Sequence, residues 1–385
     1  MRTLLGSAIV AGCALSPVSA SAQATSFVYR LGTDTVAIDQ YTRTATRLSG
    51  EMVQRSGPAV FRVVYDMTIG PDGRPTAANI TRLNGDGTAV ANAPTTTRFR
   101  FTADSAVREN VFPDSVQRRG FAMGHAFVNF PTYVYGPTEL LAALKQKGVA
   151  VDSLPALGIA GGPGMTGIVQ GAADTMRLRG GAYAMVLRYD GRSQLLSADG
   201  LFTTNKAAAT RGTTTFDLPA VARVMKPTGV LSVRDVARAS FGPGGFVLVD
   251  YGRPLVRERT VWGGALVPFD SVWRAGANDA THLMTTRTLA MGGLTLAPGM
   301  YTLWIQHTRN GTFLIVNRQT GQWGTQYDAR QDIGRLPMAV ATAPSHVEMF
   351  TIAVRAVAAD RGSLEMAWGE SVASVPFTTS VAASR

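Results

Sequence analysis

Runs of alternating apolar and polar residues recur along the chain, separated by turns rich in glycine, proline and aspartate. Residues 28–41, 45–54 and 59–69 are rich in Val, Thr, Tyr and Phe, which favour extended strands. The turn Pro71-Asp72-Gly73, which follows the third run, is typical of a β-hairpin. This pattern predicts an antiparallel sheet in the first half of the chain.

One segment departs from the strand pattern. Residues 137–148 begin with Pro and Thr and place Leu140, Leu141 and Leu144 on one face at helical spacing. Gly148 then provides a stop signal. We therefore predict a single short helix, inserted among strands.

A second series of short strands begins after Pro227-Thr228-Gly229, where the pattern breaks. Residues 233–240 and 246–251 form the first predicted hairpin, and short strands continue almost to the end. A length of 385 residues is consistent with two domains. We predict an all-β fold with an N-terminal antiparallel domain over residues 25–226, which carries the helix, and a C-terminal β-sandwich or jelly roll over residues 228–380.

The first 22 residues have the layout of a secretory signal peptide. One Arg precedes an apolar run, and the small-residue triplet Ala20-Ser21-Ala22 supplies a cleavage site. The alternative is a lipoprotein signal, because Val10-Ala11-Gly12 gives a small-residue approach to Cys13. No later run approaches the roughly 18 to 20 apolar residues that span a bilayer. We predict an exported protein, periplasmic or secreted, without a membrane span.

Cysteine and charge exclude several classes of function. Cys13 is the only cysteine, so a chain cleaved after residue 22 has neither thiol catalysis nor Cys-ligated metals. The formal net charge is +11, and only four of the 37 basic residues are lysines. The arginines are scattered, whereas nucleic-acid proteins concentrate them in a patch, so we predict no nucleic-acid partner. Acidic glycans or lipid head groups remain as anionic partners; the alternative is a solvated arginine surface.

Motifs for common chemistries are missing. The sequence contains no G-x-S-x-G, H-E-x-x-H or G-x-x-x-x-G-K-[ST]. Its histidines are widely separated, and only His346 and Glu348 share a strand face as a metal pair does. No third ligand accompanies them, so we predict no metal and no cofactor. Carboxylates for a hydrolase are available at Asp270, Asp279, Asp328 and Glu348.

Short motifs in the C-terminal part form a recognisable set. They are Tyr251-Gly252-Arg253-Pro254, Val272-Trp273-Arg274, Gly276-Ala277-Asn278, Ala280-Thr281, Pro298-Gly299, Tyr301, Asn317, Gln322-Trp323-Gly324, Glu348 and Phe350-Thr351-Ile352. Together they resemble the bacterial domain-of-unknown-function 2911 (DUF2911) family over about residues 228–377. The resemblance implies an exported protein with a β fold. It transfers no catalytic residue, since that family has no assigned activity.

Residues 251–282 carry the densest candidate chemistry, with two of the five tryptophans and four arginines. Arginine forks suit carboxylate or phosphate, tryptophan faces stack on sugars or cations, and Asn and Asp give directional hydrogen bonds. The candidate ligand-binding residues are Arg253, Trp262, Trp273, Arg274, Asn278, Asp279 and Trp323. The alternative is structural: Arg274 pairs with Asp279 or Asp270 while the tryptophans fill the core.

Two functional classes follow from these residues. The first is a non-catalytic envelope protein whose C-terminal domain binds a polar ligand such as a glycan. The second is a hydrolase of polysaccharide or peptidoglycan that uses paired carboxylates. The missing nucleophile and metal motifs favour binding.

Overall fold

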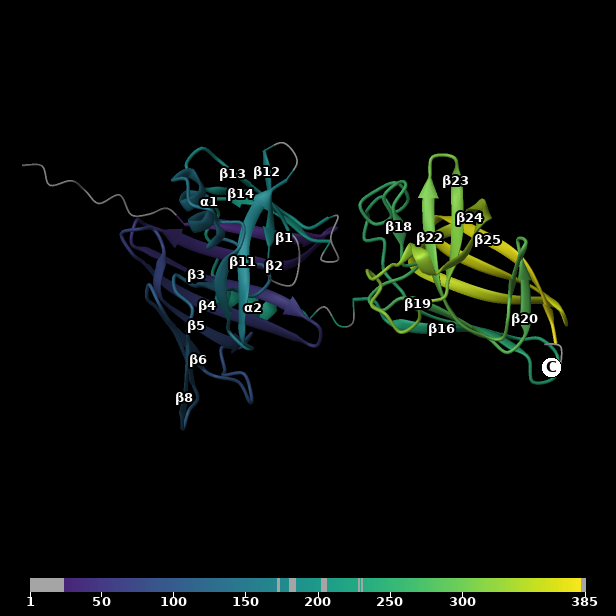
Figure 1. The fold of residues 1–385 in the computed structure, drawn as a ribbon, viewed down its shortest axis with the longest axis horizontal. Helices are drawn as coiled ribbons and strands as arrows, with labels where there is room; N and C mark the ends of the chain where they lie inside the picture. The colour runs from purple at the N-terminus through teal and green to yellow at the C-terminus, as the bar shows by residue number, and fades with distance from the viewer. Residues whose placement is uncertain are drawn as a thin grey trace, which may run out of the picture.

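The computed structural model describes residues 24–171, 174–179, 185–201, 206–227, 229 and 231–381. Strands make up 58% of the structure and helices 6%. The strands form two large sheets that share no strand (Figure 1). The predicted all-β fold is thus confirmed. The predicted signal peptide, with Cys13, lies outside the described residues.

The first sheet contains fifteen strands. Consecutive strands pair with each other, except β8 and β9, which lie at its two ends, and β1 also pairs with β15. The strands are β1 (Thr25–Leu31), β2 (Asp34–Arg43), β3 (Arg47–Ser56), β4 (Ala59–Ile69), β5 (Pro75–Asn84), β6 (Thr96–Phe101), β7 (Ala106–Val111), β8 (Val116–Phe121), β9 (Phe127–Asn129), β10 (Leu154–Gly158), β11 (Pro163–Gln170), β12 (Thr175–Arg179), β13 (Val186–Tyr189), β14 (Leu195–Asp199) and β15 (Ala208–Gly212). Their pairing is antiparallel except between β9 and β10. A parallel pair needs a long crossover, and the chain between these two strands supplies it with a helix.

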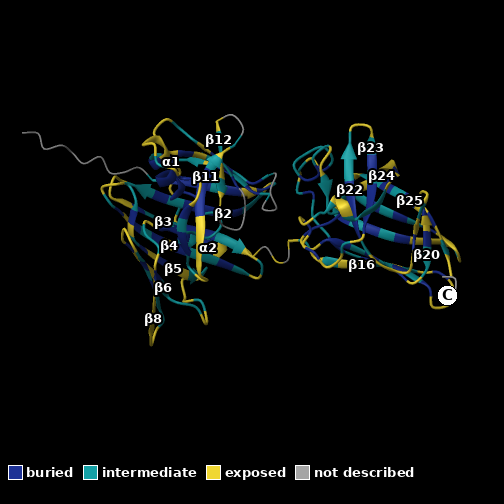
Figure 2. Cartoon of the chain, viewed as in Figure 1, coloured by how far each residue is buried: buried dark blue, intermediate teal, exposed yellow. Residues whose placement is uncertain are grey.

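The core of the first sheet is rich in tyrosine. Tyr29, Tyr41 and Tyr65 are at most 2% exposed, and Phe27 stacks on Tyr41. Alternating buried and exposed bands along the strands appear in Figure 2, as expected for sheets with one inward face. Gly50 leaves room for one of these rings, since a Cβ there would lie 2.5 Å from the Tyr65 hydroxyl.

The predicted helix is present as α1 (Thr138–Gln146). Leu140 and Leu144 are buried against the core, as their spacing predicts. Glu139 is 2% exposed and lies 3.1 Å from both Arg43 and Arg211. A buried carboxylate needs such partners, so this ion-pair network anchors the start of the helix.

A second helix, α2 (Leu218–Val224), was not predicted. Its start is capped by Asp217, whose side chain accepts a hydrogen bond from the Ala220 amide at 2.9 Å. Leu218 and Ala222 pack on the outer face of the first sheet, in a cluster with Ile38, Val53 and Val60. The helix therefore belongs with the first sheet.

The second sheet is formed by the remaining strands. They are β16 (Arg234–Ser240), β17 (Phe246–Gly252), β18 (Val272–Trp273), β19 (Thr281–Thr285), β20 (Thr288–Met291), β21 (Leu294–Leu296), β22 (Gly299–Thr308), β23 (Gly311–Asn317), β24 (Asp332–Ala358) and β25 (Arg361–Ser380), with a short 3-10 helix η1 (Ala329–Gln331). The first part of β24 pairs with β23 and the rest with β25, so this one strand runs through both layers of a sandwich. One hydrophobic cluster fills the space between the layers.

The change from one sheet to the other falls between Gly212 and Arg234. The predicted boundary at residues 227–229 lies in this interval and stays a prediction; Thr228 is outside the described residues. In the part of the chain that the structure describes, neither helix is long and apolar enough to cross a membrane.

Candidate functional site

The loops between β17 and β19 carry the candidate site. β18 holds Trp273 against β22, opposite Ile305. The chain then turns sharply, with positive φ angles of 47° at Ala275 and 62° at Asn278. The Thr281 hydroxyl closes the turn by donating a hydrogen bond to the Ala275 carbonyl at 2.8 Å. Arg274 lies between Trp273 and this turn, so the turn fixes the position from which the Arg274 side chain projects.

Two glycines let other backbone segments approach this turn closely. A Cβ on Gly252 would lie 2.2 Å from the Ala277 carbonyl oxygen, and one on Gly324 would lie 2.1 Å from Arg274 Cδ. The Gly324 amide also donates a hydrogen bond to the Asn278 carbonyl at 3.0 Å. The stem of Arg274 therefore packs on bare backbone at Gly324, which restricts its rotamers.

Arg274 forms no ion pair with any carboxylate in the described ranges. Its Nε donates a long hydrogen bond, 3.3 Å, to the Gly276 carbonyl. Burial lowers the pKa of its guanidinium, which is still charged at neutral pH. A partly buried charge without a counter-charge is costly to maintain unless a ligand supplies one.

Two further cations lie in the same environment. Within the described segments, the side chain of Arg259 donates hydrogen bonds only to carbonyls, those of Val256 at 2.9 Å and Leu255 at 2.8 Å. Burial, and secondarily the charge of Arg257, lower its pKa to about 10. Lys206, from the first sheet's half of the chain, donates from Nζ to the Ala265 carbonyl at 2.7 Å. Burial, followed by the charges of Arg274 and Arg259, lowers the pKa of Lys206 to about 8.

These cations line a cleft of about 330 Å³ between the two halves of the chain. Its basic lining residues are Arg55, Lys206, Arg257, Arg259 and Arg274. No Asp or Glu lines it among the residues that the structure describes. Arg257 alone of the five forms an ion pair there, with Asp34. The cleft is therefore positively charged, and its volume is at the lower end of small-molecule sites.

The cleft also has an aromatic wall. Trp273 stacks on Trp368 with ring centroids 5.3 Å apart and planes 14° from parallel, and both rings line the cleft. Two nitrogens of lining residues, Trp368 Nε1 and Arg55 Nε, are buried without a hydrogen-bond partner among the described residues. Unpaired cations beside the partly exposed Trp273 suit an acidic ligand with some apolar surface.

The turn that presents Arg274 contains two motifs of the sequence resemblance, Trp273-Arg274 and Gly276-Ala277-Asn278. Gly324, on which Arg274 packs, belongs to a third motif, Gln322-Trp323-Gly324. Residues 234–377 match the family described as "Protein of unknown function (DUF2911)". The predicted family resemblance is confirmed. The strands β1 to β15 lie outside this DUF2911 region, which comprises 37% of the sequence.

Other comparisons give little. No curated protein matches the chain. Among solved structures, a crystal structure of a DUF1089 family protein from Pseudomonas aeruginosa is similar, with 8% identity and a TM-score of 0.31. The alignment covers 44% of this chain and 91% of that chain. A likeness at this level carries no argument about fold or function.

Within the DUF2911 region, the predicted site residues divide into two groups. Trp273, Arg274 and Asn278 line the cleft. The ion pair of the predicted structural alternative, Arg274 with Asp279 or Asp270, is absent from the described residues: both aspartates are exposed and neither lines the cleft. The other part of that alternative, tryptophans in the core, is met by Trp304 and Trp368.

The other predicted residues support the fold around the cleft. Arg253 is held by the Phe350 carbonyl at 3.1 Å, by Asp235 at 2.9 Å and by Thr351 at 2.9 Å. Trp262 packs edge-on against Trp273 in the core. Trp323, 44% exposed, pairs through its backbone with Asp279 and lines no part of the cleft.

Sequence reasoning did not identify Lys206, Arg259 or Trp368 as site residues. Arg259 stands in the arginine-rich stretch that was singled out, so its signal was available. Lys206 and Trp368 are far from that stretch in sequence, and only the fold brings them to it.

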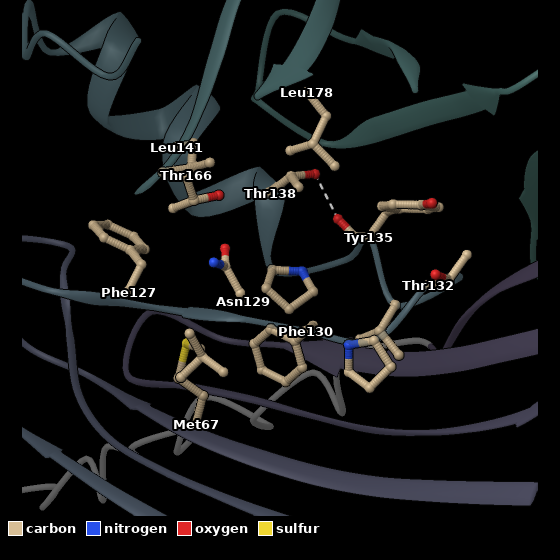
Figure 3. Close-up of a pocket in the computed structure, with 14 residues that line it drawn as sticks. Met67, Phe127, Asn129, Phe130, Thr132, Tyr135, Thr138, Leu141, Thr166 and Leu178 are labelled. Atoms are coloured by element: carbon tan, nitrogen blue, oxygen red, sulfur yellow. Dashed lines mark hydrogen bonds between the residues drawn. The ribbon is translucent and has the colours of Figure 1, made fainter. Parts of the chain in front are cut away.

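Two other places in the molecule, a histidine cluster and a small cavity, do not form sites. His346 lies 2.6 Å from Glu370 and 3.1 Å from Glu348 on an exposed surface, and hydrogen bonds, first to Glu370 and then to Glu348, raise its pKa. No group of three potential metal ligands occurs in the described segments. A cavity of about 50 Å³ beside α1 is lined mainly by apolar side chains, including Met67, Phe127 and Leu141 (Figure 3). It has room for a few water molecules only and resembles a packing gap.

Proposed function

We propose that this is an exported, non-catalytic protein that binds an acidic ligand, with acidic glycans as the first class to test, in the cationic cleft. The observation that carries the proposal is a set of four cations, Arg55, Lys206, Arg259 and Arg274, that lack a carboxylate partner among the described residues, in a cleft without acidic lining residues. Arginine forks bind carboxylates in bidentate fashion, and the partly exposed Trp273, which stacks on the buried Trp368, lines the same cleft.

The alternative hydrolase needs two carboxylates that face each other across a substrate. The four carboxylates considered for it do not line the cleft. Asp328 is bound to Arg330 at 2.9 Å, and Glu348 to His346 and to the Arg257 amide. These contacts leave no facing carboxylate pair among the four in the described structure.

Calorimetric titration of the full-length mature protein with trigalacturonate, and with neutral maltotriose as the matched ligand, tests the proposal. We expect binding of the acidic trisaccharide only, weakened by added salt. Arg274→Gln should lower the affinity by about 10- to 100-fold, as loss of a charge-assisted hydrogen bond of roughly 1.5–3 kcal/mol requires. Arg361→Gln, the same change at an exposed residue, serves as the control. Equal affinity for both trisaccharides, or equal affinity of both variants, contradicts the proposal.

Export rests on the Ala20-Ser21-Ala22 triplet. Mass spectrometry of the exported protein should find a chain that begins at Gln23. A diacylglycerol adduct on Cys13 would instead show the lipoprotein alternative.

A further inference from the structure

Lys206 differs from the other lysines in its surroundings. The chain has four lysines, and Lys145, Lys147 and Lys226 are exposed. Lys206 is partly buried in the cleft, and its Nζ donates a hydrogen bond to the Ala265 carbonyl at 2.7 Å. No carboxylate of the described residues forms an ion pair with it. An ammonium group in such a place is poorly compensated.

Two neighbouring guanidinium groups add to this effect. Burial of the Lys206 amine favours its neutral form, and the positive charges of Arg274 and Arg259 favour it further. Asp34 pairs with Arg257, and Glu348 accepts a hydrogen bond from the Arg257 amide and acts electrostatically on Arg259. Desolvation and neighbouring cations both favour the neutral form of a lysine amine, and the neutral amine is nucleophilic at neutral pH.

The hydrogen bond to Ala265 is compatible with a reactive amine. A neutral amine keeps two N–H bonds, so it can donate one to the carbonyl and still present its lone pair. With a pKa of about 8, roughly a quarter of the Lys206 side chains are neutral at pH 7.5, against about one in a thousand for an exposed lysine.

We infer that Lys206 forms a reversible imine with a carbonyl compound whose carboxylate or phosphate is held by Arg259 and Arg274. The inference rests on the proposed acidic-ligand site and specifies its ligand as an acid that also carries an aldehyde or ketone. The cations that hold the acidic group are the same ones that favour the neutral amine, so one arrangement serves both purposes.

The reaction balances without an oxidant or a further reactant. Lys206 Nζ loses a proton to solvent, and its lone pair attacks the carbonyl carbon to give a carbinolamine. Loss of the carbinolamine oxygen as water then leaves the C=N bond. Addition of water reverses each step and releases the ligand unchanged.

Reductive trapping tests the inference on the full-length protein. The probes are pyridoxal 5′-phosphate, an aldehyde with a phosphate, and pyridoxal, which lacks the phosphate. Cyanoborohydride supplies hydride to reduce the imine to a stable secondary amine, and peptide mass spectrometry gives the labelling rate at each lysine. At pH 7.5 we expect both probes to label Lys206 at least about tenfold faster than the three exposed lysines, because of its larger neutral fraction. The phosphate should increase this preference further.

Two variants complete the design. Arg274→Gln should remove most of the advantage of the phosphate probe, while Lys206→Arg, which keeps the charge, should abolish fast labelling. Tryptophan fluorescence checks that each variant is folded.

The possible failures differ. If neither probe labels Lys206 faster than Lys145, Lys147 and Lys226, the imine is wrong, and binding of trigalacturonate still decides the acidic-ligand site. If both probes prefer Lys206 equally, the inference is wrong in its ligand, and binding of trigalacturonate again decides the acidic-ligand site separately.

Discussion

Asp39 is a buried carboxyl group among the tyrosines of the first sheet. It is 0% exposed, and its Oδ1 accepts a hydrogen bond from the Tyr65 hydroxyl at 2.8 Å. Its Oδ2 has no partner in the described part of the chain. Burial raises the pKa of Asp39 to about 8, although the bond from Tyr65 opposes the shift. The group is therefore protonated in the folded protein at neutral pH.

This residue makes stability depend on pH. Because the folded-state pKa lies above the unfolded value of about 3.9, the folded protein binds more protons. The contribution of Asp39 is therefore complete below about pH 4 and is lost as the pH rises towards 8. Asp39→Asn should flatten this loss and be more stable than wild type at pH 8.5. The urea midpoint, followed by circular dichroism across pH 5–9, measures it.

Asp114→Asn, the same change at an exposed position, is the control for Asp39. If the urea midpoint of the wild type falls between pH 5 and 8 by no more than that of Asp39→Asn, Asp39 is not a buried, protonated carboxyl group.

At the residue scale, the sequence predicted part of the candidate site. Trp273, Arg274 and Asn278 were recognised because chemistry-bearing residues cluster within a few positions in a glycine-rich loop. Whether Arg274 had a carboxylate partner was not predictable, since Asp270 and Asp279 are near it in sequence and the backbone turn decides where they point. The positive φ angles at Ala275 and Asn278 carry no clear signal in residues of these types.

At the element scale, Gly324 connects the loop after β23 to the turn that presents Arg274. Gly324→Ala would put a methyl group 2.1 Å from Arg274 Cδ and 2.5 Å from the Asn278 carbonyl oxygen. Arg274 must then move, so we expect weaker binding of trigalacturonate and a loss of about 1–3 kcal/mol in stability. Calorimetry and urea unfolding measure the two effects.

Gly162→Ala is the control for Gly324→Ala, because a Cβ at Gly162 meets nothing within 4 Å. Wild-type affinity in Gly324→Ala would show that the packing of Arg274 on this glycine does not position it for a ligand.

Element lengths decided which elements the sequence could predict. The helix α1 spans two turns with a leucine face and clear start and stop signals, and it was predicted. The seven residues of α2 are too few for periodicity to stand out, although Asp217 and Pro219 are typical of a helix start. Within the 27-residue strand β24, the sequence predicted a strand only over residues 347–357; the first part of β24 is held extended by its pairing with β23.

At the scale of the whole molecule, the two sheets form separate hydrophobic clusters. We predict that limited proteolysis of the folded protein with a broad-specificity protease cuts near residues 227–229 first and leaves a stable fragment of the second sheet. Persistence of the full chain while both halves are digested together would contradict this boundary. The cleft between the halves was not predictable, because no local pattern relates Lys206 to Arg274.

The most direct measurement concerns the purpose of the charge on Arg274. All five tryptophans lie between residues 262 and 368, so their fluorescence reports the unfolding of the second sheet alone. If Arg274 serves a ligand, Arg274→Gln without ligand should be within about 1 kcal/mol of wild type, since no ion pair is broken. Trigalacturonate should then raise the unfolding temperature of wild type and not that of the variant. A variant that is less stable by roughly 3–5 kcal/mol, with no ligand shift in wild type, would show that Arg274 is a structural residue.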